Sequence, residues 1–205
     1  MKNEIILVDI GNTHFHIFDN EIYNLKEPPK LSGNIYYISV NRQKEKEFLK
    51  LNPNAIDLSK YVKFKTNYKG LGIDRIMACK SVDNGIVVDA GSAVTIDVME
   101  NGFHLGGIIT PGIYAFRECF GKISEVLKYD VEVVDDILPN NTNDALNMGS
   151  VGAIKALIEK FAENKKIYFT GSDGKFLSKM FENSVYIEDL VFRGMKKTIN
   201  ELEKL

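Results

Sequence analysis

The sequence has little of what defines several protein classes. Only two of its 205 residues are cysteine, Cys79 and Cys119, and because their spacing is not that of a metal site we expect reduced cytoplasmic thiols. Its hydrophobic runs are too short to span a bilayer, and the four apolar residues between Glu4 and Asp9 are too few for a signal sequence. The net charge is −2 without a basic stripe. We therefore expect a cytoplasmic protein that binds neither nucleic acid nor membranes.

Two common catalytic motifs are also absent. The pairs Gly121–Lys122 and Gly174–Lys175 have no glycine at Walker A spacing, so a P-loop is excluded, and no G-x-S-x-G elbow occurs. The histidines, His14, His16 and His104, fall on predicted strands without the carboxylate pattern of a metal site. We interpret them as side chains on the faces of strands.

What the sequence does contain is a motif that occurs twice. Residues 5–20 and 86–101 each place an aspartate, Asp9 or Asp89, after a buried strand, followed by a glycine turn, a second strand, an acidic residue and Asn. Burying a carboxylate is costly unless a cation or hydrogen-bond donors offset it. Glycine turns let a phosphate approach backbone N–H groups, and Mg²⁺ prefers oxygen ligands. Either motif alone is equally compatible with an ordinary hairpin, whereas the pair predicts two related halves with both aspartates facing one cleft.

The remaining patterns predict an α/β fold, because strands alternate with short helices. We divide the chain into an N-terminal half, residues 1–80, and a C-terminal half, residues 81–205. We predict strands over residues 4–18 (a hairpin), 21–25, 34–40, 55–58, 61–64, 86–98 (a hairpin), 103–110, 167–170 and 185–187, and helices over residues 42–50, 76–80, 111–128, 144–162, 176–181 and 189–205. Gly149 and Gly152 within one predicted helix indicate close packing, in the core or against another subunit.

Two glycine-containing loops have both a structural and a functional interpretation. In the first, residues 67–75, Asp74 and Arg75 are typical of a helix N-terminus, but they also suit an aspartate base beside an arginine that binds an anionic substrate. The second, residues 171–174, is typical of a plain turn capped by Ser172 or Asp173, but it could instead approach a nucleotide. The residues alone leave both pairs of alternatives open.

Four blocks together resemble type III pantothenate kinase, a family of the acetate and sugar kinase/Hsp70/actin superfamily. They are Asp9–Thr13, Gly72–Arg75, Asp89–Asp97 and Gly106–Gly112, and the resemblance covers nearly the whole chain, in order. The resemblance implies two ribonuclease-H-like halves of the actin-like ATPase type with an interdomain cleft, and a homodimer. It implies ATP-dependent phosphorylation of pantothenate to 4′-phosphopantothenate, the first step of coenzyme A biosynthesis, with Mg²⁺ and a monovalent cation, K⁺ or NH₄⁺, as cofactors.

The resemblance also implies roles for individual residues. Asp74 would be the general base, and Asp9 and Asp89 would be the metal ligands. Pantothenate would be bound by Tyr68, Gly72, Ile73, Asp74 and Arg75, with Thr142 reaching in from the partner subunit so that each active site is shared. ATP and its phosphates would be bound by Asp9, Ile10, Gly11, Asn12, Thr13, Gly91, Ser92, Gly171 and Ser172. The chain departs from the family pattern at Ser92, where Thr is common, and at the Gly171 loop, where a second glycine is usual.

Two alternatives to the kinase remain open. One is a non-catalytic regulatory homologue of the same fold, and the presence of Asp9, Asp74 and Asp89 argues against it. The other is a phosphohydrolase of the same superfamily, acting on polyphosphate or an acyl phosphate. The blocks Gly72–Arg75 and Gly106–Gly112 favour the kinase over this second alternative.

Overall fold

The computed structural model describes residues 5–135 and 137–204, and the chain falls into two compact units. Unit 1 comprises Met1–Asp83 and Asp189–Leu205, and unit 2 comprises Asn84–Glu188. These units differ from the predicted halves in two ways: the first boundary lies after residue 83 instead of residue 80, and the C-terminal segment belongs to unit 1. Glu4, the predicted start of the first strand, lies outside the described residues.

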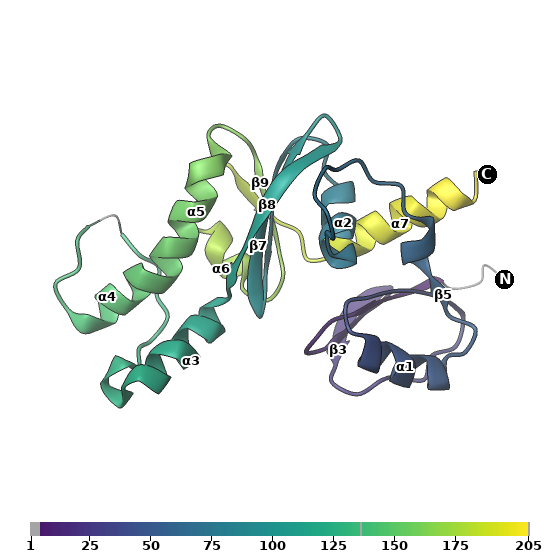
Figure 1. Ribbon diagram of the computed structural model, residues 1–205, viewed down its shortest axis with the longest axis horizontal. Coiled ribbons are helices and arrows are strands. Elements are labelled where there is room, and N and C mark those ends of the chain that lie inside the picture. The colour runs from purple at the N-terminus through teal and green to yellow at the C-terminus, as the bar shows by residue number, and fades with distance from the viewer. Residues whose placement is uncertain (1–4, 136, 205) are drawn as a thin grey trace. The chain divides into compact units, whose positions relative to one another are not determined.

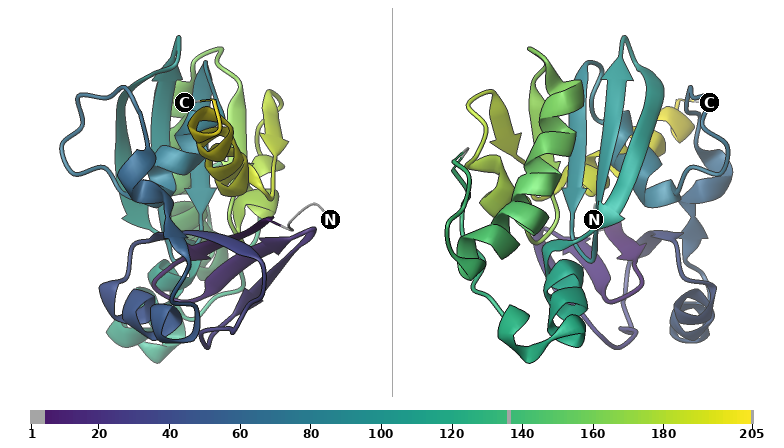
Figure 2. Two further views of the ribbon diagram at one scale, coloured as in Figure 1. Left: turned by 90° about the vertical axis from the view of Figure 1, so that its right-hand side faces the viewer. Right: turned by 60° about the vertical axis from the view of Figure 1, so that its left-hand side comes forward.

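Unit 1 is built on a five-stranded sheet in the order β3-β2-β1-β4-β5 (Figures 1 and 2). Its middle strand, β1, pairs antiparallel with β2 and parallel with β4. The elements of this unit are β1 (Ile5–Ile10), β2 (Phe15–Asp19), β3 (Glu21–Leu25), β4 (Asn34–Ser39), α1 (Arg42–Leu51), β5 (Ile56–Asp57), the 3₁₀ turn η1 (Leu58–Tyr61), α2 (Ile73–Lys80) and α7 (Leu190–Leu202). The strand predicted over residues 61–64 is not formed. Its first residue, Tyr61, is instead the last residue of the 3₁₀ turn η1. The Asp57 carboxylate caps the start of this turn by accepting the N–H of Ser59 (2.9 Å).

Helices cover this sheet through a small number of anchoring side chains. Phe48, the buried residue of α1, stacks on Phe15 of β2 with ring centroids 6.2 Å apart. The helices α2 and α7 pack side by side (Figure 1), and the ammonium of the buried Lys80 lies 2.8 Å from the carboxylate of Glu201. This packing explains why the C-terminal helix belongs to unit 1 and not to the second half of the chain.

Unit 2 repeats the arrangement with a sheet in the order β10-β9-β6-β7-β8. Its middle strand, β6, pairs antiparallel with β7 and parallel with β9. The elements are β6 (Gly85–Ala90), β7 (Ala93–Glu100), β8 (Phe103–Pro111), α3 (Ile113–Ile123), the 3₁₀ turn η2 (Glu125–Leu127), α4 (Thr142–Asn147), the π-helical turn η3 (Met148–Gly152), α5 (Ala153–Ala162), β9 (Ile167–Thr170), α6 (Gly174–Ser178) and β10 (Ser184–Tyr186). None of the described helices in either unit is both long and apolar enough to cross a membrane.

The helix predicted over residues 111–128 is shorter than expected at both ends. Pro111 is the last residue of β8, where it lies opposite Ala93, and Gly112 is the N-cap residue of α3. The helix stops at Ile123, because Ser124 adopts an extended backbone conformation (φ −162°). The helix predicted over residues 144–162 is present, but the π-helical turn η3 interrupts it.

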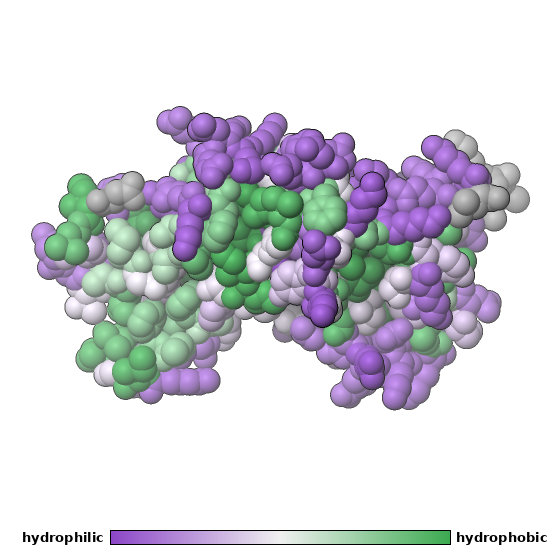
Figure 3. All heavy atoms as spheres, turned by 45° about the horizontal axis from the view of Figure 1, so that its top comes forward, coloured by the Kyte–Doolittle hydropathy of each residue, from purple (hydrophilic) through white to green (hydrophobic). Residues whose placement is uncertain are grey.

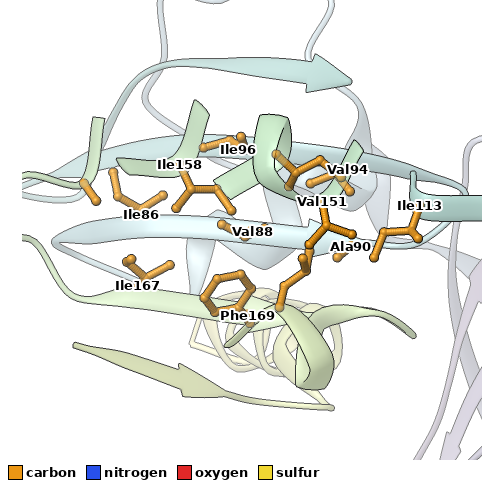
Figure 4. Packing of buried hydrophobic residues seen from close by; sticks show 13 residues of the cluster. Ile86, Val88, Ala90, Val94, Ile96, Ile113, Val151, Ile158, Ile167 and Phe169 are labelled. Carbon is orange, nitrogen blue, oxygen red and sulfur yellow. The ribbon is translucent and has the colours of Figure 1, made fainter. Parts of the chain in front are cut away.

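The core of unit 2 lies between its sheet and the helix formed by η3 and α5 (Figure 4). Val88 and Ala90 of β6 and Phe169 of β9 are fully buried there against Val151 and Ile158. Alternate residues of β6 supply this face, as expected for a strand with a period of two. The packing fixes the end of β6, and with it the position of the second predicted aspartate.

Candidate active site

The first predicted site lies at the C-terminal end of β1. Asp9 is the second-last residue of this strand, and its Oδ1 atom is buried. A hydrogen bond from the Gly11 N–H to the His14 carbonyl (3.0 Å) closes the turn that follows. Asn12 and Thr13 are exposed at the tip of the turn. The predicted phosphate-binding residues of unit 1, Asp9–Thr13, therefore lie together at the C-terminal end of the middle strand, as the motif requires.

Helix α1 begins beside this turn. Its N-cap residue, Asn41, accepts the N–H of Lys44 (3.0 Å) and donates through Nδ2 to Oδ1 of Asn12 (3.3 Å). The Lys44 ammonium donates to the carbonyl of Thr13 (2.7 Å), while the carbonyl of the buried Ile10 accepts a hydrogen bond from the β4–α1 loop (3.1 Å). Sequence reasoning missed Asn41 and Lys44. Asparagine before a helix is a recognisable N-cap signal, but nothing in the sequence indicates contact with a turn about thirty residues earlier.

The predicted pantothenate residues of unit 1 gather at the start of α2. Gly72 is the N-cap residue, Ile73 begins the helix, and the Asp74 carboxylate accepts the N–H of Arg75 (2.8 Å). A Cβ at Gly72 would lie 2.5 Å from Oδ1 of Asp74, so a larger residue there would require this carboxylate to shift. Arg75 is buried, and its guanidinium lies 5.0 Å from the ring centroid of Tyr68. Five predicted residues are thus brought together.

The second predicted phosphate turn joins β6 to β7. Asp89 is again the second-last residue of the middle strand. The Gly91 N–H donates to the Ala93 carbonyl (2.9 Å), and Ser92 is exposed at the tip. The carbonyl of Ser92 accepts the N–H of Gly112 (3.1 Å), which ties the turn to the start of α3. The two turns therefore share their position in the sheet, and a glycine N–H closes each of them, but the acceptor is the carbonyl three residues on in the first turn and two residues on in the second. Each turn is also anchored to different neighbours.

The second glycine-containing loop, residues 171–174, for which a nucleotide contact is predicted, lies directly against this second turn. Gly171 has φ +82°, and a Cβ there would overlap the Ala90 carbonyl and lie 2.5 Å from Oδ1 of Asp89. The N–H of Asp173 donates to the same Ala90 carbonyl (2.9 Å), and Ser172 is exposed. Asp173 is the N-cap residue of α6, but its side chain forms no capping hydrogen bond. The structure brings Gly171 and Ser172 to the predicted phosphate turn, and helix capping by Asp173 does not explain the loop.

Thr142 lies apart from the other predicted site residues of unit 2. It is the exposed first residue of α4 and directly follows the N-cap residue Asn141. The side chain of Asn141 accepts the N–H of Asp144 (3.0 Å). The views in Figures 1 and 2 place α4 beyond the end of α5, away from the strands. A single chain therefore does not bring Thr142 to the β6–β7 turn.

Comparison with known proteins assigns the family. The family model described as type III pantothenate kinase matches residues 37–164. The type III pantothenate kinase of Wolinella succinogenes is 42% identical over 98% of this chain and 99% of its own length. A crystal structure from Campylobacter jejuni, described as a conserved Baf family transcriptional activator, has 43% identity and a TM-score of 0.89, covering 98% of this chain and 100% of that chain. The chain belongs to the type III pantothenate kinase family.

A more distant solved structure extends the fold comparison beyond type III pantothenate kinases. MreB 5 of Spiroplasma citri has 9% identity and a TM-score of 0.52, covering 100% of this chain and 98% of that chain. Likeness at this identity concerns the fold alone. Together with the two five-stranded mixed sheets, it confirms the predicted α/β fold of the actin-like ATPase type.

In this family member, burial alters the titration of groups beside both turns. Burial is the largest influence on His16 and lowers its pKa; the hydrogen bond to Asn24 opposes this, and the charge of Lys44 lowers the pKa further. Burial of His16 therefore favours its neutral form. Burial likewise raises the pKa of Tyr186 above its ordinary value, with a smaller contribution from the charge of Asp89. The carboxylate of Asp89 thus influences Tyr186 as well as the Gly171 loop.

Burial also raises the pKa of Asp173 above its ordinary value of 3.8. The folded chain then holds the Asp173 proton more tightly than the unfolded chain does, so ionisation of this carboxyl destabilises the fold at neutral pH. We expect Asp173→Asn to raise Tm at pH 7 without nucleotide or Mg²⁺, and the difference from wild type to shrink as pH falls towards 3.8. Thermal unfolding across this pH range tests the prediction. The exposed Asp130→Asn is the control, and an Asp173→Asn variant no more stable than wild type at pH 7 contradicts it.

Proposed function

We propose that this protein transfers the γ-phosphoryl group of ATP to the primary hydroxyl of pantothenate, forming 4′-phosphopantothenate and ADP at the first step of coenzyme A biosynthesis. Family membership supports the reaction, since the family model and the Wolinella succinogenes relative, which is matched over 99% of its own length, are both described as type III pantothenate kinase. The observation in this chain that carries the proposal is the start of α2, where Asp74, Arg75 and Tyr68 lie together. Because ATP is the phosphoryl donor, the proposal places the protein in the cytoplasm.

Asp74 is the general base in this proposal. The pantothenate oxygen forms a bond to the γ-phosphorus while the bond from this phosphorus to the β–γ bridging oxygen breaks, and ADP leaves. The proton of the attacking hydroxyl passes to the Asp74 carboxylate. A carboxylate in the first turn of a helix is stabilised by the helix dipole, and the ionised form is the one that can accept a proton. Phosphoryl transfer otherwise requires positioning and charge stabilisation more than covalent help.

Arg75 and Tyr68 bind pantothenate in this proposal, together with the backbone at Gly72 and Ile73. Pantothenate carries a carboxylate, and a guanidinium can bind a carboxylate through two parallel hydrogen bonds. The contact of Arg75 with the face of Tyr68 fixes the guanidinium in one place without using an N–H donor. A fixed arginine loses less conformational freedom when the substrate binds than a mobile one.

The two turns are proposed to serve the phosphates of ATP and Mg²⁺. Asp9 and Asp89 are chemically suited to the metal, since both offer carboxylate oxygens and one oxygen of Asp9 is buried. Mg²⁺ commonly binds one or two carboxylates and otherwise substrate phosphates and water, so neither unit needs a complete ligand cage. When bound, the metal neutralises charge on the phosphates. That the two aspartates serve one cleft stays a prediction.

The nucleoside end of ATP is assigned to Gly171 and Ser172. The left-handed backbone at Gly171 removes side-chain bulk next to Asp89 and Ala90, so a ligand held at the β6–β7 turn can extend over this loop. The monovalent cation, K⁺ or NH₄⁺, belongs to the proposal through the family alone, and no residue is assigned to it.

A regulatory function is the second candidate, because the structurally similar Campylobacter jejuni protein is described as a transcriptional activator. The net charge of −2 does not favour binding to nucleic acid. A regulator also has no need for Asp9, Asp74 and Asp89 in one chain. Release of ADP that depends on pantothenate, and not on water or other small alcohols, separates the kinase from a regulator and from a phosphohydrolase.

Asp74→Asn tests the assignment of the base. The amide cannot accept the proton, so kcat should fall by about 10²–10⁴-fold, while KM for pantothenate changes little because size and position are conserved. A coupled ADP-release assay measures both quantities. Asp83→Asn, which changes an exposed aspartate after α2, is the matched control and should behave as wild type. Near-normal turnover by a folded Asp74→Asn protein would remove Asp74 as the base.

We also propose that the protein is a homodimer in which Thr142 completes the partner's pantothenate site. Large apolar side chains of unit 2 are strongly exposed near α3 and before α4, among them Val126 (78%), Ile137 (74%) and Leu138 (92%). Figure 3 shows apolar residues gathered on this part of the unit. Contiguous exposed apolar surface marks an interaction site, and a groove of about 320 Å³ beside it is lined by Leu138, Asp144 and their neighbours. Thr142, the exposed first residue of α4, lies in the chain between Asn140 and Asp144, which both line this groove.

Mixing two inactive variants tests the shared site. If Asp74 of one subunit acts with Thr142 of the other, a dimer of one Asp74→Asn chain and one Thr142→Trp chain has one site with both lesions and one with neither. Random mixing in equal amounts should then restore about a quarter of wild-type activity, since half the dimers are mixed and each has one intact site. Ala145→Trp, exposed on the same helix, should stay active alone. No recovery, with mixed dimers shown to form, would mean that each subunit acts independently.

A further inference from the structure

The clearest unassigned feature near the first phosphate turn is Lys44. Its ammonium donates to the carbonyl of Thr13 (2.7 Å), although 31 residues separate them in the chain. The same helix start is joined to the turn by the hydrogen bond from Asn41 to Asn12 (3.3 Å). The two hydrogen bonds hold the first turn of α1 against the glycine turn, and together they fix the position of Lys44 relative to Thr13.

The surroundings of Lys44 keep its charge at this turn. The side chain is half-buried, and its ammonium lies 5.1 Å from the ring centroid of the fully buried Phe15. Its charge is also felt by His16 on the neighbouring strand. The ring contact and the hydrogen bond to Thr13 both hold the ammonium beside the turn. The bond to Thr13 uses one of its three N–H donors, and Asn12 and Thr13 leave the tip of the turn exposed to a ligand.

We propose that Lys44 is a further phosphate-binding residue, which holds the Gly11–Thr13 turn in shape and donates to a β- or γ-phosphate oxygen of the bound nucleotide. The inference rests on the proposed ATP-dependent function and adds a residue that none of the sequence motifs includes. A carbonyl at the tip of a phosphate-binding turn repels an anion. A lysine that binds this carbonyl removes the repulsion and supplies a positive charge at the same point. A lysine acts on phosphate as a point charge.

Binding of nucleotides to Lys44→Met, Lys44→Arg and Lys46→Met tests this inference. Lys46 is exposed on the same helix and serves as the matched control. Isothermal titration should show Mg·ATP binding weakened about 10- to 100-fold in Lys44→Met, the loss expected for a hydrogen bond to a charged group. Lys44→Arg should recover part of the affinity. Binding of AMP, which lacks the β- and γ-phosphates, and KM for pantothenate should stay near wild type in all three variants.

The outcomes separate this inference from the proposed reaction. If Lys44→Met binds Mg·ATP as tightly as Lys46→Met does, Lys44 binds no phosphate, whether or not wild type phosphorylates pantothenate. Equal weakening of ATP and AMP, or a lowered Tm with unchanged ATP affinity of the folded protein, would show a purely structural role and also overturn the inference. If wild type forms no phosphopantothenate but Lys44→Met selectively loses ATP affinity, the inference stands and the proposed reaction fails.

Discussion

A carboxylate at the end of a central strand is the constraint on which the rest of this structure depends. Asp9 and Asp89 are each the second-last residue of the middle strand in a five-stranded sheet. In both sheets this strand pairs antiparallel with the next strand along the chain and parallel with a later one. A middle strand has a neighbouring strand on both sides, so a charge near its end is partly removed from water. This desolvation costs free energy unless a ligand or hydrogen-bond donors offset it. The glycine turns leave room for such a ligand.

The two units meet this constraint with different residues. In each, the loop after the parallel neighbour donates an N–H to the last residue of the middle strand, from Val40 to Ile10 (3.1 Å) and from Asp173 to Ala90 (2.9 Å). In unit 1 this loop leads into α1 and brings a positive charge to the turn. In unit 2 it brings the compact backbone of Gly171 instead. In the proposed function, the charge at the first turn serves the phosphates of the nucleotide and the Gly171 loop serves its nucleoside.

Sequence patterns predicted the parts of this fold that depend on local chemistry. Short apolar runs located the strands that end in Asp9 and Asp89, and the repeated motif predicted two related halves. Contacts between distant segments were not predictable. Nothing in the sequence places Lys44 against Thr13 or the C-terminal helix beside α2, because these depend on tertiary packing. Pro111 was assigned to a helix by its local preference, whereas pairing with Ala93 holds it in β8.

The Mg²⁺ dependence of turnover in Asp9→Asn and Asp89→Asn shows whether both turns serve one phosphoryl transfer. Each substitution keeps the side chain's size but removes a charge that Mg²⁺ and the phosphates require. A shared role of the two turns in one transfer predicts that both variants remain folded, turn over far more slowly, and need more Mg²⁺ for half-maximal rate than wild type. Wild-type turnover with an unchanged Mg²⁺ requirement in either variant would contradict it.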